Sequence, residues 1–121
     1  MSTVLVVDDD RQLRAWLRTL LEAKGHRVLE AGEGNEGLAR YDLHQPDLVV
    51  LDIYLPGKEG LETILLLRKK NPGVKILAIS GNLIEGYDVC QSAKAFGARD
   101  TLAKPFSAEV FLERVGQLLS C

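Results

Sequence analysis

Residues 48–52 read Leu48-Val49-Val50-Leu51-Asp52, four apolar residues followed directly by a carboxylate. The apolar residues are continuous and do not alternate with polar ones. A strand that is buried on both faces has this pattern, which is typical of a parallel sheet covered by helices. Residues 76–79, Ile-Leu-Ala-Ile, form a second run of the same kind. The two runs predict a sheet with helices on both faces.

Strand-like segments recur at intervals of roughly 24 residues, about the length of one strand–helix unit. The predicted strands are Thr3–Val7, Arg27–Ala31, Leu48–Leu51, Lys75–Ile79 and Arg99–Ala103. Amphipathic segments separate them, and right-handed crossovers would place these helices on both faces. The predicted fold class is α/β, a doubly wound five-stranded parallel sheet with the flavodoxin-like strand order 2-1-3-4-5.

The helices are predicted from apolar residues at helical spacing and from capping residues. The first helix should begin after Asp10, whose carboxylate suits a helix N-terminus, and end at Gly25. The last should follow Ser107, a plausible N-cap. Three further helices are expected around Glu36–Tyr41, Leu61–Leu65 and Tyr87–Phe96.

The composition is that of an ordinary soluble domain: 121 residues, 46% apolar, 26% charged and a net charge of −2. This composition does not indicate direct contact with nucleic acid or a membrane, and no apolar run is long enough to span a bilayer. Met1-Ser2-Thr3 leads into the first strand without signal-peptide features. We expect one cytoplasmic domain over residues 1–121, with free thiols at Cys90 and Cys121 and no output domain in this chain.

Polar residues follow four of the predicted strands, at the edge of the sheet where doubly wound folds carry their sites. These residues are Asp8, Asp9 and Asp10, then Asp52, then Ser80 and Gly81, and finally Lys104 and Pro105. Clustered carboxylates resist ionisation unless a cation compensates them, and Mg²⁺ prefers oxygen ligands. A carboxylate beside Mg²⁺, an ammonium group and a hydroxyl can accept and hold a phosphoryl group.

These motifs, in this order and spacing, closely resemble the receiver domains of response regulators in two-component signalling. The matching stretches are Val4–Asp10, Asp47–Gly57, Ile79–Gly81 and Lys104–Phe106. The resemblance covers nearly the whole chain. It implies a signalling protein that takes a phosphoryl group from a histidine kinase or phosphotransfer protein and then switches a protein-binding surface. No turnover of an external substrate is implied, so the protein is not expected to be an enzyme.

The resemblance also implies a role for each site residue. Asp52 would be the phosphorylation site, forming an aspartyl phosphate. The implied Mg²⁺ ligands are Asp8 (through water), Asp9, Asp52 and the backbone carbonyl of Tyr54. The residues implied to contact the phosphoryl group are Ser80, Gly81 and Lys104. The Lys104–Pro105 peptide bond would be cis.

The downstream partner implied by the resemblance is another protein, or an output domain missing from this chain. The oligomeric state is left open. One departure from the family pattern concerns Thr101, three residues before Lys104, where an aromatic switch residue is usual. A threonine cannot fill the same pocket, so we expect the read-out to depend instead on the segment Ser80–Asn82 and the helix after it.

Three alternatives remain open from the sequence. Asp8-x-Asp10 after an apolar strand also occurs in haloacid-dehalogenase-like phosphatases, although Gln12 departs from their pattern. A flavodoxin-type module shares the predicted architecture, but three aspartates would repel a flavin phosphate. The third alternative is a degenerate receiver that only binds proteins. We expect His26 and His44 to lie at the surface without a role in the site.

A second departure generates a prediction about Tyr54, whose bulky side chain lies two residues past Asp52. We expect this ring to slow the attack of water on the aspartyl phosphate. The variant Tyr54→Asn should therefore lose its phosphoryl group faster than the unsubstituted protein. The decay of the phosphorylated mass with time measures this rate. Equal lifetimes of the phosphorylated variant and the phosphorylated unsubstituted protein would contradict the prediction.

Overall fold

The computed structural model describes residues 2–53, 60–81, 93–94 and 96–120. Within these ranges five parallel strands form one sheet in the order β2-β1-β3-β4-β5, so the predicted fold class is confirmed. The strands are β1 (Thr3–Val7), β2 (Arg27–Ala31), β3 (Leu48–Asp52), β4 (Ile76–Ser80) and β5 (Asp100–Ala103). The described helices are α1 (Arg11–Ala23), α2 (Gly34–His44), α3 (Gly60–Lys70) and α5 (Ala108–Ser120).

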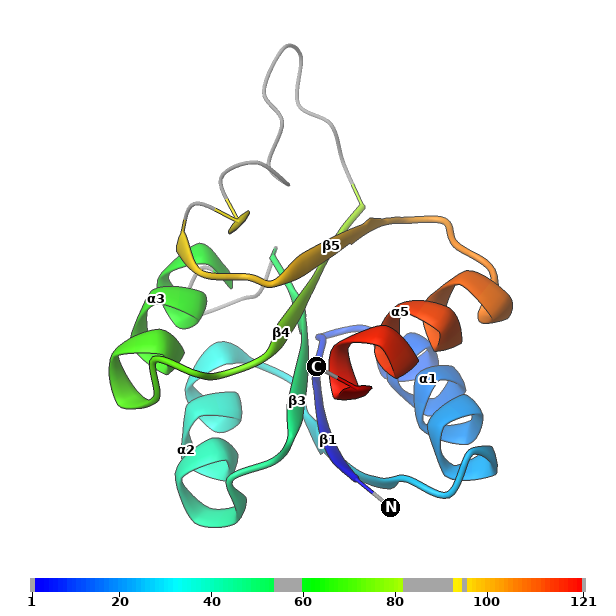
Figure 1. The fold of residues 1–121 in the computed structure, drawn as a ribbon, viewed down its shortest axis with the longest axis horizontal. Helices are drawn as coiled ribbons and strands as arrows, with labels where there is room; N and C mark the ends of the chain where they lie inside the picture. The colour runs from blue at the N-terminus through cyan, green and yellow to red at the C-terminus, as the bar shows by residue number, and fades with distance from the viewer. Residues whose placement is uncertain (1, 54–59, 82–92, 95, 121) are drawn as a thin grey trace, which may run out of the picture.

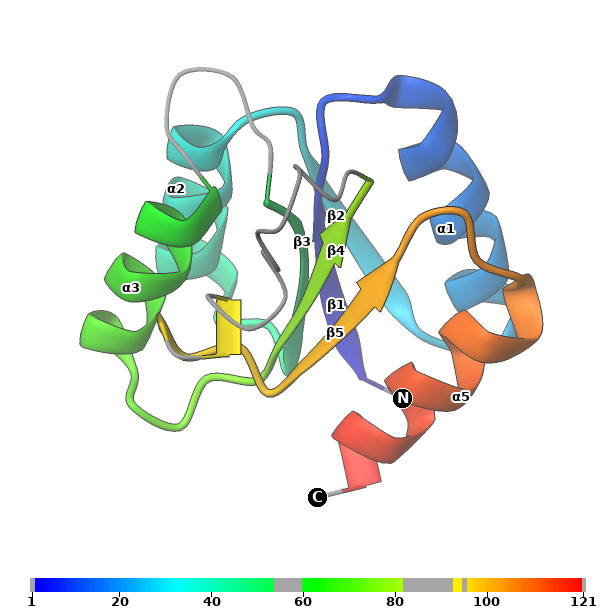
Figure 2. The same ribbon diagram turned by 90° about the horizontal axis from the view of Figure 1, so that it is seen from above.

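The sheet is the middle layer of three. Helices α1 and α5 cover one of its faces, and α2 and α3 cover the other (Figures 1 and 2). Successive residues of a strand point to opposite faces. In β1, Val4 and Val6 therefore pack toward α1 and α5, while Leu5 and Val7 join the cluster beneath α2 and α3. Both faces are buried, as the continuous apolar runs predict.

Two predicted strands, β1 and β2, match the structure residue for residue. In the other three the ends differ by one residue: β3 gains Asp52, β4 loses Lys75 and gains Ser80, and β5 loses Arg99. Asp52 lies opposite Ile79, and Ser80 lies opposite Ala103. The backbone pairing thus continues one residue past the apolar run, because a polar side chain does not interrupt backbone hydrogen bonds.

The predicted helix ends follow from local chemistry. The Asp10 carboxylate accepts hydrogen bonds from the backbone N–H groups of Gln12 and Leu13, so Asp10 is the N-cap of α1. Gly25 has a φ of +86°, and the Ser107 hydroxyl accepts from the Val110 N–H. These predictions are confirmed. The helix predicted around Tyr87–Phe96 lies largely outside the described residues, where Cys90 and Cys121 also fall.

Gly60 marks a close approach that only glycine permits. Its N–H donates to the Ile53 carbonyl at 2.8 Å, across the segment that joins β3 to α3. A Cβ at this position would overlap the backbone of Ile53. The contact ties the start of α3 to the end of β3, one residue beyond Asp52.

In the described part of the chain, no helix has both the length and the apolar character that a membrane span needs.

Two helical glycines generate opposite predictions. Gly116→Ala should raise the free energy of unfolding by about 0.5–1 kcal/mol, because alanine favours the helix and the added Cβ meets nothing within 4 Å. Gly37→Ala should lower it by about 1–2 kcal/mol, because its Cβ would lie 2.9 Å from Cγ2 of the stiff, buried Val7. Urea denaturation measures both, and two changes of the same sign would contradict this packing.

Candidate functional site

Three carboxylates from two neighbouring strands meet at one edge of the sheet. Asp8 and Asp9 follow β1, and Asp52 ends β3, the strand that pairs with β1. One carboxylate oxygen from each residue lies within 4.8 Å of the others. Asp8 and Asp52 are 1% and 5% exposed, whereas Asp9 is exposed. The strand ends that the sequence singles out do converge.

Asp8 is held through its backbone and both oxygens. Its N–H donates to the Ala31 carbonyl at 3.0 Å, which continues the β1–β2 pairing. Its Oδ1 accepts from the Asp10 N–H at 2.8 Å. The Asp10 carboxylate caps α1, so the third aspartate of the run serves the helix rather than the cluster.

Lys104 bridges the two buried carboxylates. Its Nζ lies 3.3 Å from Oδ2 of Asp8 and 3.2 Å from Oδ2 of Asp52. The Lys104 N–H donates to the Ser80 carbonyl at 2.8 Å, so the backbone places the lysine beside β4. The Lys104–Pro105 peptide bond is cis.

Burial and charge act together on these groups. Burial, with repulsion from Asp52, raises the pKa of Asp8 to about 6, against the opposing effects of the Asp10 N–H and of Lys104. Burial alone would lower the pKa of Lys104, but attraction by Asp52 and Asp8 raises it above its ordinary value. Among the described residues, the cluster holds three carboxylates, and the Lys104 ammonium group lies against two of them, so negative charge is in excess. A divalent cation would balance it.

The donor set fits Mg²⁺. Mg²⁺ prefers oxygen ligands, and one carboxylate oxygen from each of the three aspartates lies within 4.8 Å of the other two. Asp8 and Asp52 are buried within the surrounding structure, whereas the Asp9 side chain is exposed. Tyr54, whose carbonyl the resemblance adds as a ligand, lies outside the described residues.

Ser80 and Gly81 flank the cluster. Ser80 ends β4 and is 6% exposed, next to Ala103 across the sheet. A Cβ at Gly81 would lie 3.4 Å from Cδ of Lys104, an ordinary contact. The structure thus places Asp8, Asp9, Asp52, Ser80, Gly81 and Lys104 at one edge of the sheet.

The model of the response regulator receiver domain family matches residues 4–116. This chain belongs to the response regulator receiver family.

Solved receivers share the whole fold. The receiver domain of NtrX from Brucella abortus superposes with a TM-score of 0.90 at 31% identity, covering 97% of this chain and 98% of that one. A CheY-like receiver protein from Methanospirillum hungatei gives a TM-score of 0.91 at 29% identity, covering 99% and 94%.

Curated relatives are of two lengths. The chemotaxis protein CheY of Listeria monocytogenes is 34% identical over 114 residues, which are 93% of this chain and 94% of that protein. The probable transcriptional regulatory protein TcrX of Mycobacterium tuberculosis is 34% identical over 117 residues, 97% of this chain. The chain spans about half the length of TcrX and of several other regulators that it matches.

The predicted switch position lies beside the site, not in it. Thr101 is half-buried in β5, opposite Ala78. Its carbonyl accepts from Nη1 of Arg114 at 3.0 Å, and the same nitrogen lies 3.1 Å from Oδ2 of Asp100. The sequence did not single out Arg114, which ties α5 to β5 in this receiver.

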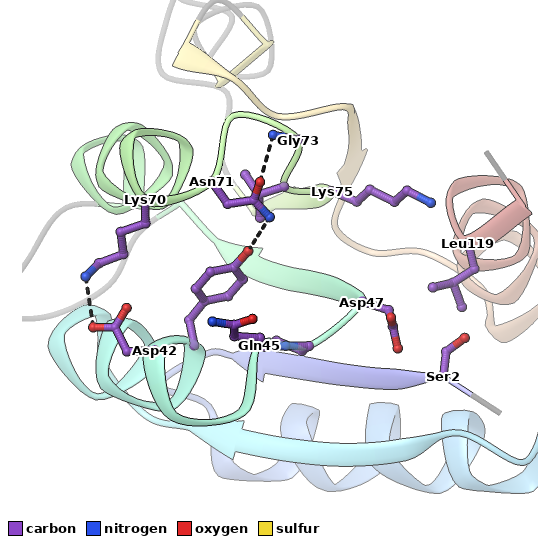
Figure 3. A pocket seen from close by; sticks show the side chains of 12 residues that line it. Ser2, Asp42, Gln45, Asp47, Lys70, Asn71, Gly73, Lys75 and Leu119 are labelled. Carbon is purple, nitrogen blue, oxygen red and sulfur yellow. Dashed lines mark hydrogen bonds and ion pairs between the residues drawn. The ribbon is translucent and has the colours of Figure 1, made fainter.

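A pocket of about 640 Å³ lies at the opposite edge of the sheet from the acidic cluster (Figure 3). Its lining includes Ser2, Asp47 and Lys75, which lie just before β1, β3 and β4. Several of its side chains pair with one another, as Lys70 does with Asp42 at 2.8 Å. It is remote from the acidic cluster and shares no residue with it.

The raised pKa of Asp8 generates a prediction with a definite sign. Folding raises this pKa from 3.8 to about 6, so ionised Asp8 opposes folding of the metal-free protein, increasingly so as pH rises from about 4 to above 6. Asp8→Asn should therefore raise the free energy of unfolding by about 1–2 kcal/mol at pH 8, with a smaller gain at pH 5.

Urea denaturation in the presence of EDTA, from pH 5 to 8, measures this difference. The exposed Asp42 is the matched control, and Asp42→Asn should change stability by less than about 0.5 kcal/mol over the same range. A loss of stability in Asp8→Asn at pH 8 would show that Lys104 outweighs burial at Asp8.

Proposed function

We propose that this receiver accepts a phosphoryl group on Asp52, with Mg²⁺ bound alongside, and that phosphorylation switches a protein-binding surface. The observation that carries the proposal is the position of the Lys104 ammonium, 3.2 Å from Asp52 and 3.3 Å from Asp8, beside the three-carboxylate cluster. A nucleophilic carboxylate, a metal-ligand set and a fixed cation are the parts that phosphoryl transfer needs.

Asp9, Asp52 and the backbone carbonyl of Tyr54 would hold the metal, with Asp8 acting through water. When bound, Mg²⁺ would neutralise charge on the phosphoryl oxygens. Asp8 is fixed by the Asp10 N–H and by Lys104, which supports its role as an anchored member of the set. Asp9 is exposed and reaches the same space from the loop that follows β1.

In the transfer itself, a carboxylate oxygen of Asp52 attacks the phosphorus of a phosphohistidine. The new O–P bond forms as the P–N bond of the donor breaks, and the leaving imidazole takes up a proton. Lys104 stays beside Asp52 and pairs with the transferred group. Ser80 offers a hydroxyl donor from the end of β4, and Gly81, which follows it, would also contact the phosphoryl group. Positioning and charge compensation therefore do most of the work.

The proposed donor is a histidine kinase or a phosphotransfer protein, and the proposed recipient of the signal is a downstream protein or an attached output domain. We propose one domain over residues 1–121, in the cytoplasm, without direct contact with nucleic acid or membrane. Thr101 lacks the ring of an aromatic switch residue. The read-out would therefore depend on the segment after Ser80, with Arg114 coupling β5 to α5.

The phosphatase alternative loses support from the geometry at Asp10. An Asp-x-Asp phosphatase needs its second aspartate in the site, but here the Asp10 carboxylate caps α1 through Gln12 and Leu13. No specific observation favours this alternative over a receiver.

The test is to incubate the chain with Mg²⁺ and acetyl phosphate and to measure its intact mass. One added phosphoryl group is expected because the Asp52 carboxylate is the nucleophile, and it should be absent with EDTA. Asp52→Asn keeps the shape of the side chain but lacks the nucleophile, so it should gain no mass.

Asp47→Asn is the control for the loss of a carboxylate, since Asp47 lies at the opposite edge of the sheet, and it should be labelled normally. If no mass is gained, the same chain is titrated with beryllofluoride in Mg²⁺. Failure of that Mg²⁺-dependent binding as well would rule out the phosphoacceptor role.

A further inference from the structure

Arg14 reaches the acidic loop from the side of α1 and contacts its backbone. Its Nη1 donates to the Asp8 carbonyl at 2.6 Å, at the short end for a charge-assisted hydrogen bond. The side chain is only 16% exposed, which is low for an arginine on a surface helix. The sequence pointed to the carboxylates of this loop and did not single out Arg14.

Glu30 on β2 fixes the direction of this guanidinium. Its Oε1 lies 3.2 Å from Nε of Arg14, and its Oε2 lies 2.8 Å from Nη1 of Arg18. Glu30 is ionised at neutral pH even at its ordinary pKa, and the hydrogen bond from Arg18 lowers that pKa further. Because a guanidinium is a rigid planar fork, anchoring Nε also aims Nη1 at the Asp8 carbonyl.

Gly32 leaves the space that the guanidinium occupies. A Cβ at Gly32 would lie 3.3 Å from Nη1 of Arg14, tighter than most contacts of this kind. The Arg14 side chain therefore extends from α1 toward β2. Glu30 of β2 orients it, and the small Gly32 after β2 leaves space for it.

The consequence for the loop follows from the planarity of the peptide group. The Asp8 carbonyl and the Asp9 nitrogen belong to one rigid plane. A hydrogen bond that fixes the Asp8 carbonyl therefore also fixes the direction in which the chain continues to Asp9. Asp9 is exposed, so packing does not set its position and the backbone must.

We propose that Arg14 is a positioning residue that presets Asp8 and Asp9 for a divalent cation, through the Asp8 carbonyl and under the control of Glu30. This inference rests on the proposed function, because it concerns the same metal site. It assigns Arg14 no contact with the phosphoryl group and no part in the transfer.

The test is a calorimetric titration of the metal-free full chain with Mg²⁺ alone. Arg14→Met keeps much of the stem but removes the donor, and it should weaken Mg²⁺ binding roughly tenfold, as loss of a group that orients metal ligands typically does. Arg18→Met is the matched control, because Arg18 shares Glu30 and the same helix but donates to Glu30 and not to the Asp8 carbonyl. Its titration should superimpose on that of the unsubstituted chain.

Arg14→Lys is a second variant, which keeps the test valid if Arg14→Met does not fold. Lysine keeps the buried charge but has no fork to hold Glu30 and the carbonyl together, so its Mg²⁺ affinity should also fall. A second readout in the metal-free protein is the ¹⁵N shift of the Asp9 amide, which senses a hydrogen bond to the preceding carbonyl. This chemical shift should change in Arg14→Lys and remain unchanged in Arg18→Met.

The outcomes separate the two proposals. If the unsubstituted chain binds no Mg²⁺, the proposed function falls, and the positioning role falls with it. If that chain binds Mg²⁺ and the Arg14 variants bind equally well, only the positioning role is overturned. An equal loss in Arg18→Met would also overturn it, because the effect would then belong to the ion pairs of Glu30.

Discussion

The repulsion between two buried carboxylates, Asp8 and Asp52, is the constraint on which the site depends. Asp8 is too deeply buried to ionise at no cost, and its pKa, raised first by burial and further by Asp52, records that cost. The ammonium group of Lys104 lies against both and compensates part of the charge. The negative charge that remains is what, under the proposed function, would attract a divalent cation and with it a phosphoryl group to this edge of the sheet.

The rest of the fold serves to hold these charges together against their repulsion. Parallel pairing of β1 with β3, and of β4 with β5, brings the ends of the strands to one edge. Apolar clusters on both faces keep the strands rigid, so the cost of bringing the carboxylates together is met by burial elsewhere. The capped N-terminus of α1 and the Asp8–Asp10 contact shape the loop itself.

Charge around the site is arranged in two layers. In the inner layer, Lys104, which directly follows β5, lies against the carboxylates of Asp8 and Asp52. In the outer layer, Arg14 donates to the Asp8 carbonyl of the loop, and Glu30 holds Arg14 in place. Under the two proposals, the inner layer would set how strongly the site attracts a cation, and the outer layer would set the positions of the ligands before the cation binds.

Much of this was predictable from the sequence because it depends on local patterns. Continuous apolar runs determine that the strands are buried on both faces, and Asp10, Gly25 and Ser107 determine where helices begin and end. The order of acidic and basic residues at the strand ends determines which groups can meet, since parallel strands share an edge. Strand ends were harder to predict, because the backbone pairing between strands continues through Asp52 and Ser80 despite their polar side chains.

Only the tertiary structure decided which charges touch and what they do to one another. Lys104 and Asp8 are 96 residues apart, and nothing local requires the ammonium group to lie between two carboxylates. Arg14 has no sequence signal that separates it from its exposed neighbour Arg11, because its role depends on Glu30 and Gly32 from another strand and turn. The pKa of Asp8 likewise follows from burial that is complete only once the sheet has formed.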